Sequence, residues 1–198
     1  MIARNGCCCE SSRRTYCYTV DREDVIRTVT GPWDRFARDN EGEDVCSRAQ
    51  VIGRSLWDFV TGAETRHLYR ALMAKVREDR RSRRVSIRCD SPEARRFLRV
   101  TLSAEAEGGV HFCSEVLRIE SRPPVELLRR RREHSDEIIA ICSFCKAIEV
   151  AEEWLETEEG VNRLHLFEKE ILPRLSHGVC PTCYEAVMRD LDEEAPEA

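Results

Sequence analysis

The chain lacks the long apolar segment that a membrane-spanning helix needs. No uninterrupted apolar run among its 198 residues approaches the roughly 18 residues that indicate such a helix. The N-terminal residues from Met1 to Cys9 also lack the continuous apolar stretch of a secretory signal. We therefore expect a soluble cytoplasmic protein without a membrane partner.

Catalytic motifs are missing as well. Glycine occurs only nine times. The sequence contains no phosphate-binding glycine loop, nucleophile elbow, kinase histidine box or metalloprotease helix. We therefore expect a protein that is not an enzyme and has no catalytic residues.

Cysteine, in contrast, is abundant, with 11 residues. In a secreted chain this number would indicate disulfides, but without an export signal it favours thiols and metal ligands. Four cysteines, Cys17, Cys46, Cys89 and Cys113, are scattered singly. A single cysteine in a strand is usually a small buried hydrophobe, so we assign these four no role.

The strongest chemical signal is a set of two Cys-x-x-Cys pairs. Cys142 and Cys145 form the first pair, Cys180 and Cys183 form the second, and 34 residues separate the pairs. Two intervening residues let both sulfurs of a pair turn onto one ion, so two pairs complete a tetrahedral four-thiolate shell. Zinc is the expected ion. An iron–sulfur cluster and four metal-free thiols are the alternatives.

The residues around the second pair support a metal site. Gly178 and Pro181 favour a tight turn in which backbone N–H groups point at sulfur. His177 is expected to hydrogen-bond a ligand sulfur or, as an alternative, to replace one cysteine. The 34-residue separation exceeds the usual spacing of about 15 to 20, which predicts a small element of structure between the pairs. A helix is expected after Cys183, where Tyr184, Val187, Met188 and Leu191 recur at helical spacing.

Charge divides the chain into two unlike halves. The formal net charge is −5, but residues 133–198 carry 17 acidic and 5 basic side chains, whereas residues 1–132 carry 20 acidic and 27 basic ones. The division follows Pro123-Pro124 and the arginine run 129–132, where we place a domain boundary. An acidic half with four thiolates should repel phosphate, so we expect a protein partner and no nucleic acid.

The basic half predicts alternating strands and helices. Strands are expected at 16–21 and 25–30, and a short helix is expected to begin with Pro32 in its first turn. The stretch 61–64 matches a capping box, and the long helix after it carries Leu68, Leu72 and Val76 at four-residue spacing. Three further strands with alternating apolar residues are expected around 85–89, 98–102 and 110–116.

This order of elements resembles a PAS domain, a five-stranded antiparallel sheet with helices over one face that serves bacterial sensors. The resemblance covers about residues 15–120 and includes Gly53-Arg54-Ser55-Leu56-Trp57-Asp58-Phe59. The C-terminal part resembles a short cysteine module that follows PAS or receiver domains in bacterial signalling proteins. The matching residues are Ile141-Cys142-Ser143-Phe144-Cys145-Lys146, Trp154 and Ser176-His177-Gly178-Val179-Cys180-Pro181-Thr182-Cys183-Tyr184.

Together the two resemblances imply an α+β signalling protein built from successive parts. These are a flexible tail (1–14), a PAS-like sensor domain (15–121), a connecting helix (122–139), a four-cysteine zinc-binding module (140–191) and an acidic tail (192–198). The implied function is regulatory, with a sensing and dimerising domain coupled to a zinc–thiolate interaction module. A thiol or iron–sulfur redox sensor and a DNA-binding transcriptional regulator are the alternatives. A homodimer is expected through the connecting helix and the sheet.

The sequence does not identify a ligand of the PAS-like part. It has no helix of the Asn-Cys-Arg-Phe-Leu-Gln type, which a flavin-adduct photosensor would need. His67 could bind haem, but its neighbours Arg66 and Arg70 indicate a solvated face. The aromatic residues Trp33, Phe36, Trp57 and Phe59 are expected in the core, with a small-molecule pocket among them as the alternative.

Overall fold

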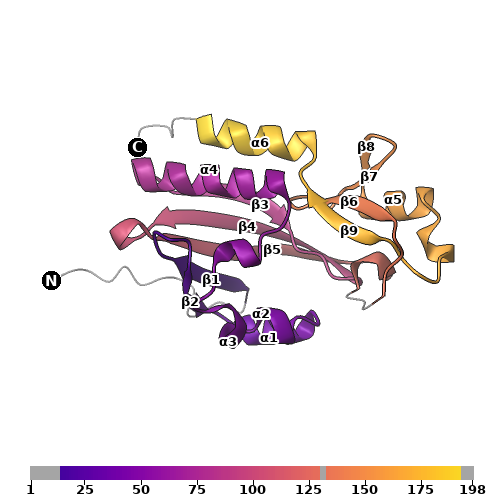
Figure 1. The fold of residues 1–198 in the computed structure, drawn as a ribbon, viewed down its shortest axis with the longest axis horizontal. Coiled ribbons are helices and arrows are strands. Elements are labelled where there is room, and N and C mark those ends of the chain that lie inside the picture. The colour runs from indigo at the N-terminus through magenta and orange to yellow at the C-terminus, as the bar shows by residue number, and fades with distance from the viewer. Residues whose placement is uncertain (1–13, 130–132, 193–198) are drawn as a thin grey trace.

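The computed structural model describes residues 14–129 and 133–192, which form an α+β fold with two β-sheets (Figure 1). The larger sheet has five antiparallel strands in the order β2-β1-β5-β4-β3. Its strands are β1 (Thr15–Val20), β2 (Ile26–Thr30), β3 (Arg83–Arg88), β4 (Ala94–Ala104) and β5 (Val110–Ser121). The five strands that the sequence predicts are therefore all present, with ends that differ by a few residues.

The smaller sheet has four strands in the order β8-β7-β6-β9. Its strands are β6 (Ile138–Cys142), β7 (Ile148–Val150), β8 (Glu153–Leu155) and β9 (Arg174–Gly178). The pair β6 and β9 is parallel, and the other pairs are antiparallel. We call residues 14–129 the sheet unit and residues 133–192 the cysteine module.

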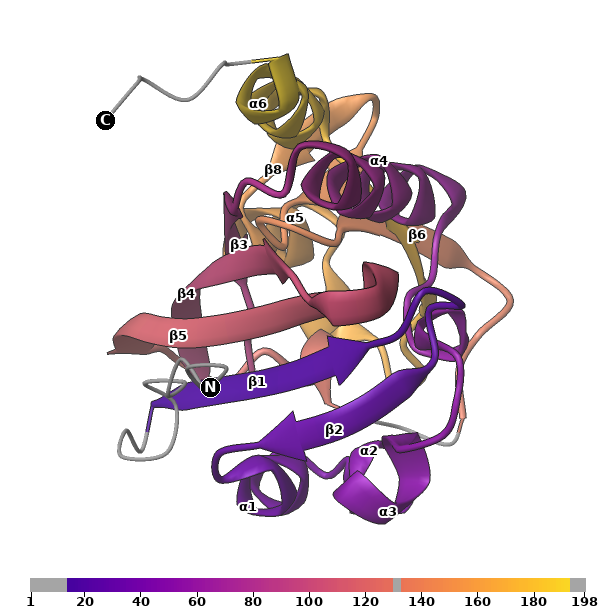
Figure 2. The ribbon, with the colours of Figure 1, turned by 90° about the vertical axis from the view of Figure 1, so that its left-hand side faces the viewer.

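Helix α4 covers one face of the five-stranded sheet, and α6 lies beside α4 (Figures 1 and 2). The predicted apolar stripe of α4 is confirmed, because Leu68, Leu72 and Val76 are all 0% exposed. The helices are α1 (Trp33–Asp39), α2 (Glu43–Cys46), α3 (Arg48–Val51), α4 (Ala63–Asp79), α5 (Thr157–Arg163) and α6 (Pro181–Asp192). Short 3-10 turns are η2 (Leu56–Asp58), η3 (Ala106–Gly108), η4 (Glu126–Leu128) and η5 (Leu166–Glu168). Among the described residues, no helix has the length and apolar character to cross a membrane.

The predicted capping box at the start of α4 is wrong. The N-cap is Gly62, with a φ of 84° and no side-chain hydrogen bond. A β-carbon at this position would lie 2.0 Å from the carbonyl oxygen of His177 in β9. Glycine is required here because the backbones of the two parts touch and because φ is positive.

The predicted connecting helix is also wrong in the described part of 122–139. The turn η4 is the only helical element there, and β6 begins at Ile138. Pro123-Pro124 removes two backbone donors, and the N–H groups of Arg122 and Val125 bond to the carbonyls of Glu93 and Pro92 instead. Residues 130–132, the tail 1–13 with its three adjacent cysteines, and residues 193–198 lie outside the described residues.

One hydrophobic core runs through both parts of the molecule. Cys142, Phe144, Cys180 and Val187 of the cysteine module belong to the same buried cluster as Leu68 and its neighbours in the sheet unit. A second, smaller cluster lies within the cysteine module and includes Ile141, Ile148 and Leu166, with Val125 and Leu127 from the sheet unit. The expected charge boundary therefore does not separate two independent cores.

Buried ion pairs join the two parts at the end of the five-stranded sheet. The carboxylate of Asp90, whose side chain is 1% exposed, contacts Arg88 and lies 3.2 Å from the guanidinium of Arg122. Arg122 also lies 3.1 Å from Glu158, and Arg88 donates to both oxygens of Glu156 at 2.8 Å. Burial lowers the pKa of Arg88, but the hydrogen bonds that Arg88 donates to Asp90 and Glu156 outweigh it and raise that pKa above its usual value.

We predict that this network stabilises the contact between the two parts. Arg122→Met keeps an aliphatic stem but leaves Asp90 and Glu158 without one cationic partner. It should lower the free energy of unfolding by about 3 kcal/mol, measured by urea denaturation. The matched control is Arg35→Met, because Arg35 is 72% exposed in its pair with Asp39. That change should cost less than about 1 kcal/mol, and equal losses in both variants would contradict the prediction.

Candidate metal centre

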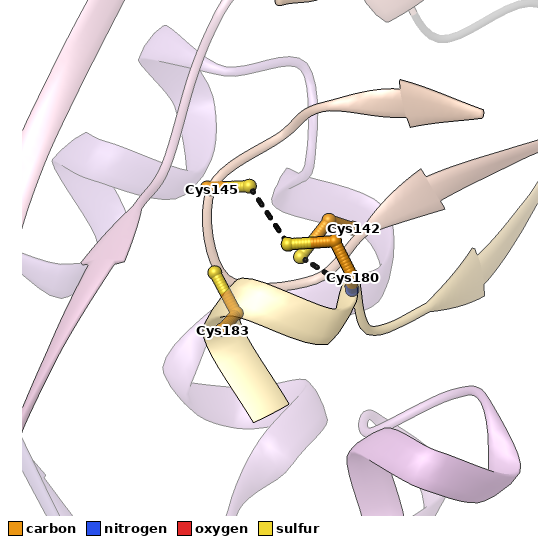
Figure 3. Close-up of side chains that lie close together, drawn as sticks. All are labelled: Cys142, Cys145, Cys180 and Cys183. Carbon is orange, nitrogen blue, oxygen red and sulfur yellow. Dashed lines mark hydrogen bonds between the residues drawn. The ribbon is translucent and has the colours of Figure 1, made fainter. Parts of the chain in front are cut away.

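Two segments of the cysteine module bring the four predicted ligands together. Cys142 is the last residue of β6, and Cys145 lies in the turn that leads to β7. Cys180 directly precedes α6, and Cys183 lies in the first turn of that helix. Figure 3 shows the four side chains converging from these two segments. Their sulfur atoms all lie within 4.8 Å of one another.

The sulfur positions fit a tetrahedral ion. The Sγ atoms of Cys145 and Cys180 are 3.7 Å apart (Figure 3). A tetrahedron of sulfurs each about 2.3 Å from zinc has edges of about 3.8 Å. A disulfide, in contrast, needs a sulfur separation of about 2.05 Å. The arrangement therefore resembles a four-thiolate metal shell and differs from a disulfide pair.

Tight turns hold each pair of cysteines. In the first pair, Lys146 adopts a φ of 65° and its N–H bonds to the carbonyl of Cys142 at 3.0 Å. The chain thereby reverses, and the N–H of Cys142 reaches the carbonyl of Ala147 at 2.8 Å. In the second pair, Pro181 begins α6, a position where a missing N–H costs no helical hydrogen bond. The N-terminus of α6 also favours negative charge on the two thiolates beside it.

Backbone donors point at the sulfurs, as the turn residues predict. The N–H of Cys180 donates to the Sγ of Cys142 at 3.4 Å (Figure 3). Hydrogen bonds from the thiols of Cys145 and Cys183 lower the pKa of Cys142. The hydrogen bond between Cys145 and Cys142 raises the pKa of Cys145 to about 12. The hydrogen bond between Cys183 and Cys142 likewise raises the pKa of Cys183. A divalent ion held by the four sulfurs would displace the thiol protons.

The donor set fits zinc or iron, because four thiolates close the coordination shell. Cys142 is 0% exposed and Cys180 is 4% exposed, so half of the ligands lie in the common core. No coordination position is left for a substrate or for a reactive water molecule. The metal that these residues would hold therefore supplies cross-linking and charge neutralisation.

His177 lies near the cluster but is not part of it. It is an exposed residue of β9, and the group of side chains that could hold a metal comprises the four cysteines alone among the described residues. Partial burial of the ring, and secondly the charge of Lys146, lower the pKa of His177. Its side chain lines a cavity of about 190 Å³ together with Phe59, Tyr69 and Lys146.

The four predicted aromatic residues have separate partners. Trp33 donates to the carbonyl of Cys46 at 2.7 Å, and Trp57 donates to the carboxylate of Asp24 at 2.9 Å. The ring of Phe36 lies 4.8 Å from that of Tyr16. Of the four, Phe59 is the one that lines the cavity beside His177. Trp33, Trp57 and Phe59 pack against the main core, which agrees with their expected role as core aromatics.

Three contacts that the sequence did not indicate attach the centre to α4. The hydroxyl of Thr65 donates to that of Ser143 at 2.8 Å and lies 3.5 Å from the carbonyl of Gly178. Gly62 touches the backbone of His177. A small residue at the start of a helix is a weak signal, because many helices begin with one for capping alone.

No protein-family model matches the chain, and no curated protein is significantly similar to it. The geometry of the four-cysteine cluster and its contacts with the sheet unit are therefore the observations that bear on function.

We predict one zinc ion per chain when the protein is purified anaerobically without added metal. Cys180→Ser should abolish stoichiometric zinc, because the shell loses a ligand in the core. Cys46→Ser is the matched control and should keep the zinc, since Cys46 lies in α2 outside the cluster. Elemental analysis measures the metal, and the visible spectrum distinguishes zinc from an iron–sulfur cluster.

Iron with inorganic sulfide would contradict the choice of zinc. Unchanged zinc content in Cys180→Ser would contradict the ligand assignment itself.

Proposed function

We propose that the chain is a non-enzymatic bacterial regulatory protein in which a PAS-like sensing and dimerising domain is coupled to a zinc–thiolate interaction module. The observation that carries the proposal is the packing of the cysteine cluster against α4. Cys142 and Cys180 belong to the same buried cluster as Leu68 and Leu72 of that helix. A change in the metal centre therefore alters the packing of the helix that covers the sheet.

The arrangement of the sheet unit supports the PAS-like assignment. A five-stranded antiparallel sheet with a long helix over one face is the arrangement that the sequence resemblance implies. Tyr18 in β1 and Phe112 in β5 stack at 4.6 Å on the face that α4 covers, and Tyr69 of α4 lies 6.4 Å from Phe112. These rings fill the space between helix and sheet, so a sensed ligand would be small.

The charge of the cysteine module supports a protein partner. Glu149 and Glu152 are exposed, whereas Glu156 and Glu158 pair with arginines of the sheet unit. The remaining exposed carboxylates, together with the net charge of a four-thiolate zinc site, disfavour phosphate and favour a basic protein surface. Salt-sensitive binding of duplex DNA would favour the DNA-binding alternative and contradict this part of the proposal.

Coupling between the metal centre and α4 can be tested at Gly62. Gly53 has the same φ of 84°, but a β-carbon there would meet no atom within 4 Å. Gly53→Ala should therefore show only backbone strain, about 1 kcal/mol. Gly62→Ala adds a clash with the carbonyl of His177, so it should destabilise the protein further and weaken zinc binding at least about tenfold.

The measurement is zinc affinity by competition with a chromogenic chelator, alongside urea denaturation. Equal zinc affinities in the two variants would show that the helix and the metal centre are not coupled.

The dimer is the second testable part of the proposal. Ile119 in β5 is 51% exposed, and a second copy would cover it together with Leu117, which is 43% exposed. We predict that light scattering gives the mass of a dimer and that Ile119→Glu gives a monomer. Ile171→Glu is the matched control, because Ile171 is 52% exposed in the cysteine module. A monomeric wild-type protein at all concentrations would contradict the dimer.

A further inference from the structure

Two cysteines without a role in the metal centre meet across the central strands of the larger sheet. Cys17 in β1 is directly opposite Cys113 in β5, and their Sγ atoms are 2.9 Å apart. Directly opposite residues of antiparallel strands have Cα atoms about 4.5 or 5.5 Å apart. Both values lie within the range of about 4.4 to 6.8 Å that a disulfide accepts. The two sulfurs would need to approach by roughly 0.9 Å to reach a bonded separation.

The pair lies on the face of the sheet that α4 does not cover. Tyr18 and Phe112, the next residues in each strand, stack toward α4, and neighbouring residues in a strand point to opposite faces. The two thiols are therefore separated from the four-cysteine cluster by the sheet itself. Chemistry at one group of thiols does not require the other.

The two members of the pair differ in burial. Cys17 is 1% exposed, whereas Cys113 is only partly buried. An oxidant from solution therefore reaches Cys113 first, and Cys17 is positioned within the protein to react with the product. This division into an accessible thiol and an adjacent resolving thiol is the arrangement that a redox-responsive pair needs.

We propose that Cys17 and Cys113 form a reversible disulfide in response to a peroxide. The Cys113 sulfur attacks one peroxide oxygen, the O–O bond breaks, and the departing oxygen takes up the thiol proton to leave as water. Cys17 then attacks the sulfur of the resulting sulfenic acid, the S–O bond breaks, and the hydroxyl leaves as a second water with the proton of Cys17. Two thiols are oxidised by two electrons, and one peroxide is reduced to two waters. A dithiol reductant reverses the change by thiol–disulfide exchange.

The disulfide would link β1 and β5, which are neighbours in the sheet but far apart in sequence. Linking residues 17 and 113 restricts the unfolded chain over a long loop. Oxidation should therefore raise the melting temperature of the zinc-loaded protein by roughly 5 to 10 °C.

Peptide mapping of the full zinc-loaded chain tests the proposal. After hydrogen peroxide and alkylation, trypsin releases Thr15–Arg22 and Val100–Arg118, each with a single cysteine. The two peptides should appear linked, and dithiothreitol should separate them. Cys46→Ser should form the same link, whereas Cys17→Ser should lose it and instead accumulate a sulfenic acid at Cys113 that dimedone traps. Cys113→Ser should leave Cys17 unoxidised because Cys17 is buried.

Three outcomes would overturn the proposal. They are the absence of the linked peptides while zinc is retained, preferential linkage of Cys113 to another cysteine, and equal dimedone labelling of Cys113 in Cys17→Ser and Cys46→Ser. Zinc content measured on the same samples distinguishes this result from a failure of the metal centre. A protein without zinc that still forms the link would contradict the proposed zinc site and support the disulfide.

Discussion

The buried carboxylate of Asp90 constrains the whole molecule. A charge with 1% exposure is stable only with cationic partners, and Arg88 and Arg122 supply them. The same two arginines bind Glu156 and Glu158, so the end of β3, the end of β5 and the start of α5 must meet at one place. The cysteine module is thereby held against the sheet unit from one side, while α4 and α6 hold it from another (Figure 1).

The four-cysteine cluster lies against this attachment. The four sulfurs come from two segments that are joined through the smaller sheet and α5. Cys142 and Cys180 lie in the core that the sheet unit shares, so an ion held by the four sulfurs would be anchored next to α4. Metal binding would therefore stabilise a surface that the sheet unit also contacts.

The opposite charges of the two halves form ion pairs with each other within the folded chain. The acidic half suggested attraction to a basic surface elsewhere, and part of that attraction is satisfied by Arg88, Arg95 and Arg122 of the same molecule. Burial raises the pKa of Glu158, but its backbone contact and the hydrogen bonds of Arg95 and Arg122 outweigh this effect and lower it. Glu149 and Glu152 of the same module are exposed.

Local sequence patterns were enough to predict the five strands of the larger sheet, helix α4 and the four cysteines that converge. Alternation in the strands and the spacing of Leu68, Leu72 and Val76 are local properties, and so is the two-residue gap inside each cysteine pair. Features that depend on distant contacts appear only in the folded chain. Residues 122–139, expected as a connecting helix, contain the turn η4 and the start of strand β6. Backbone N–H groups in this stretch bond to carbonyls of the sheet unit and of β9. In the same way, only strand register places Cys17 opposite Cys113, 96 residues away in sequence.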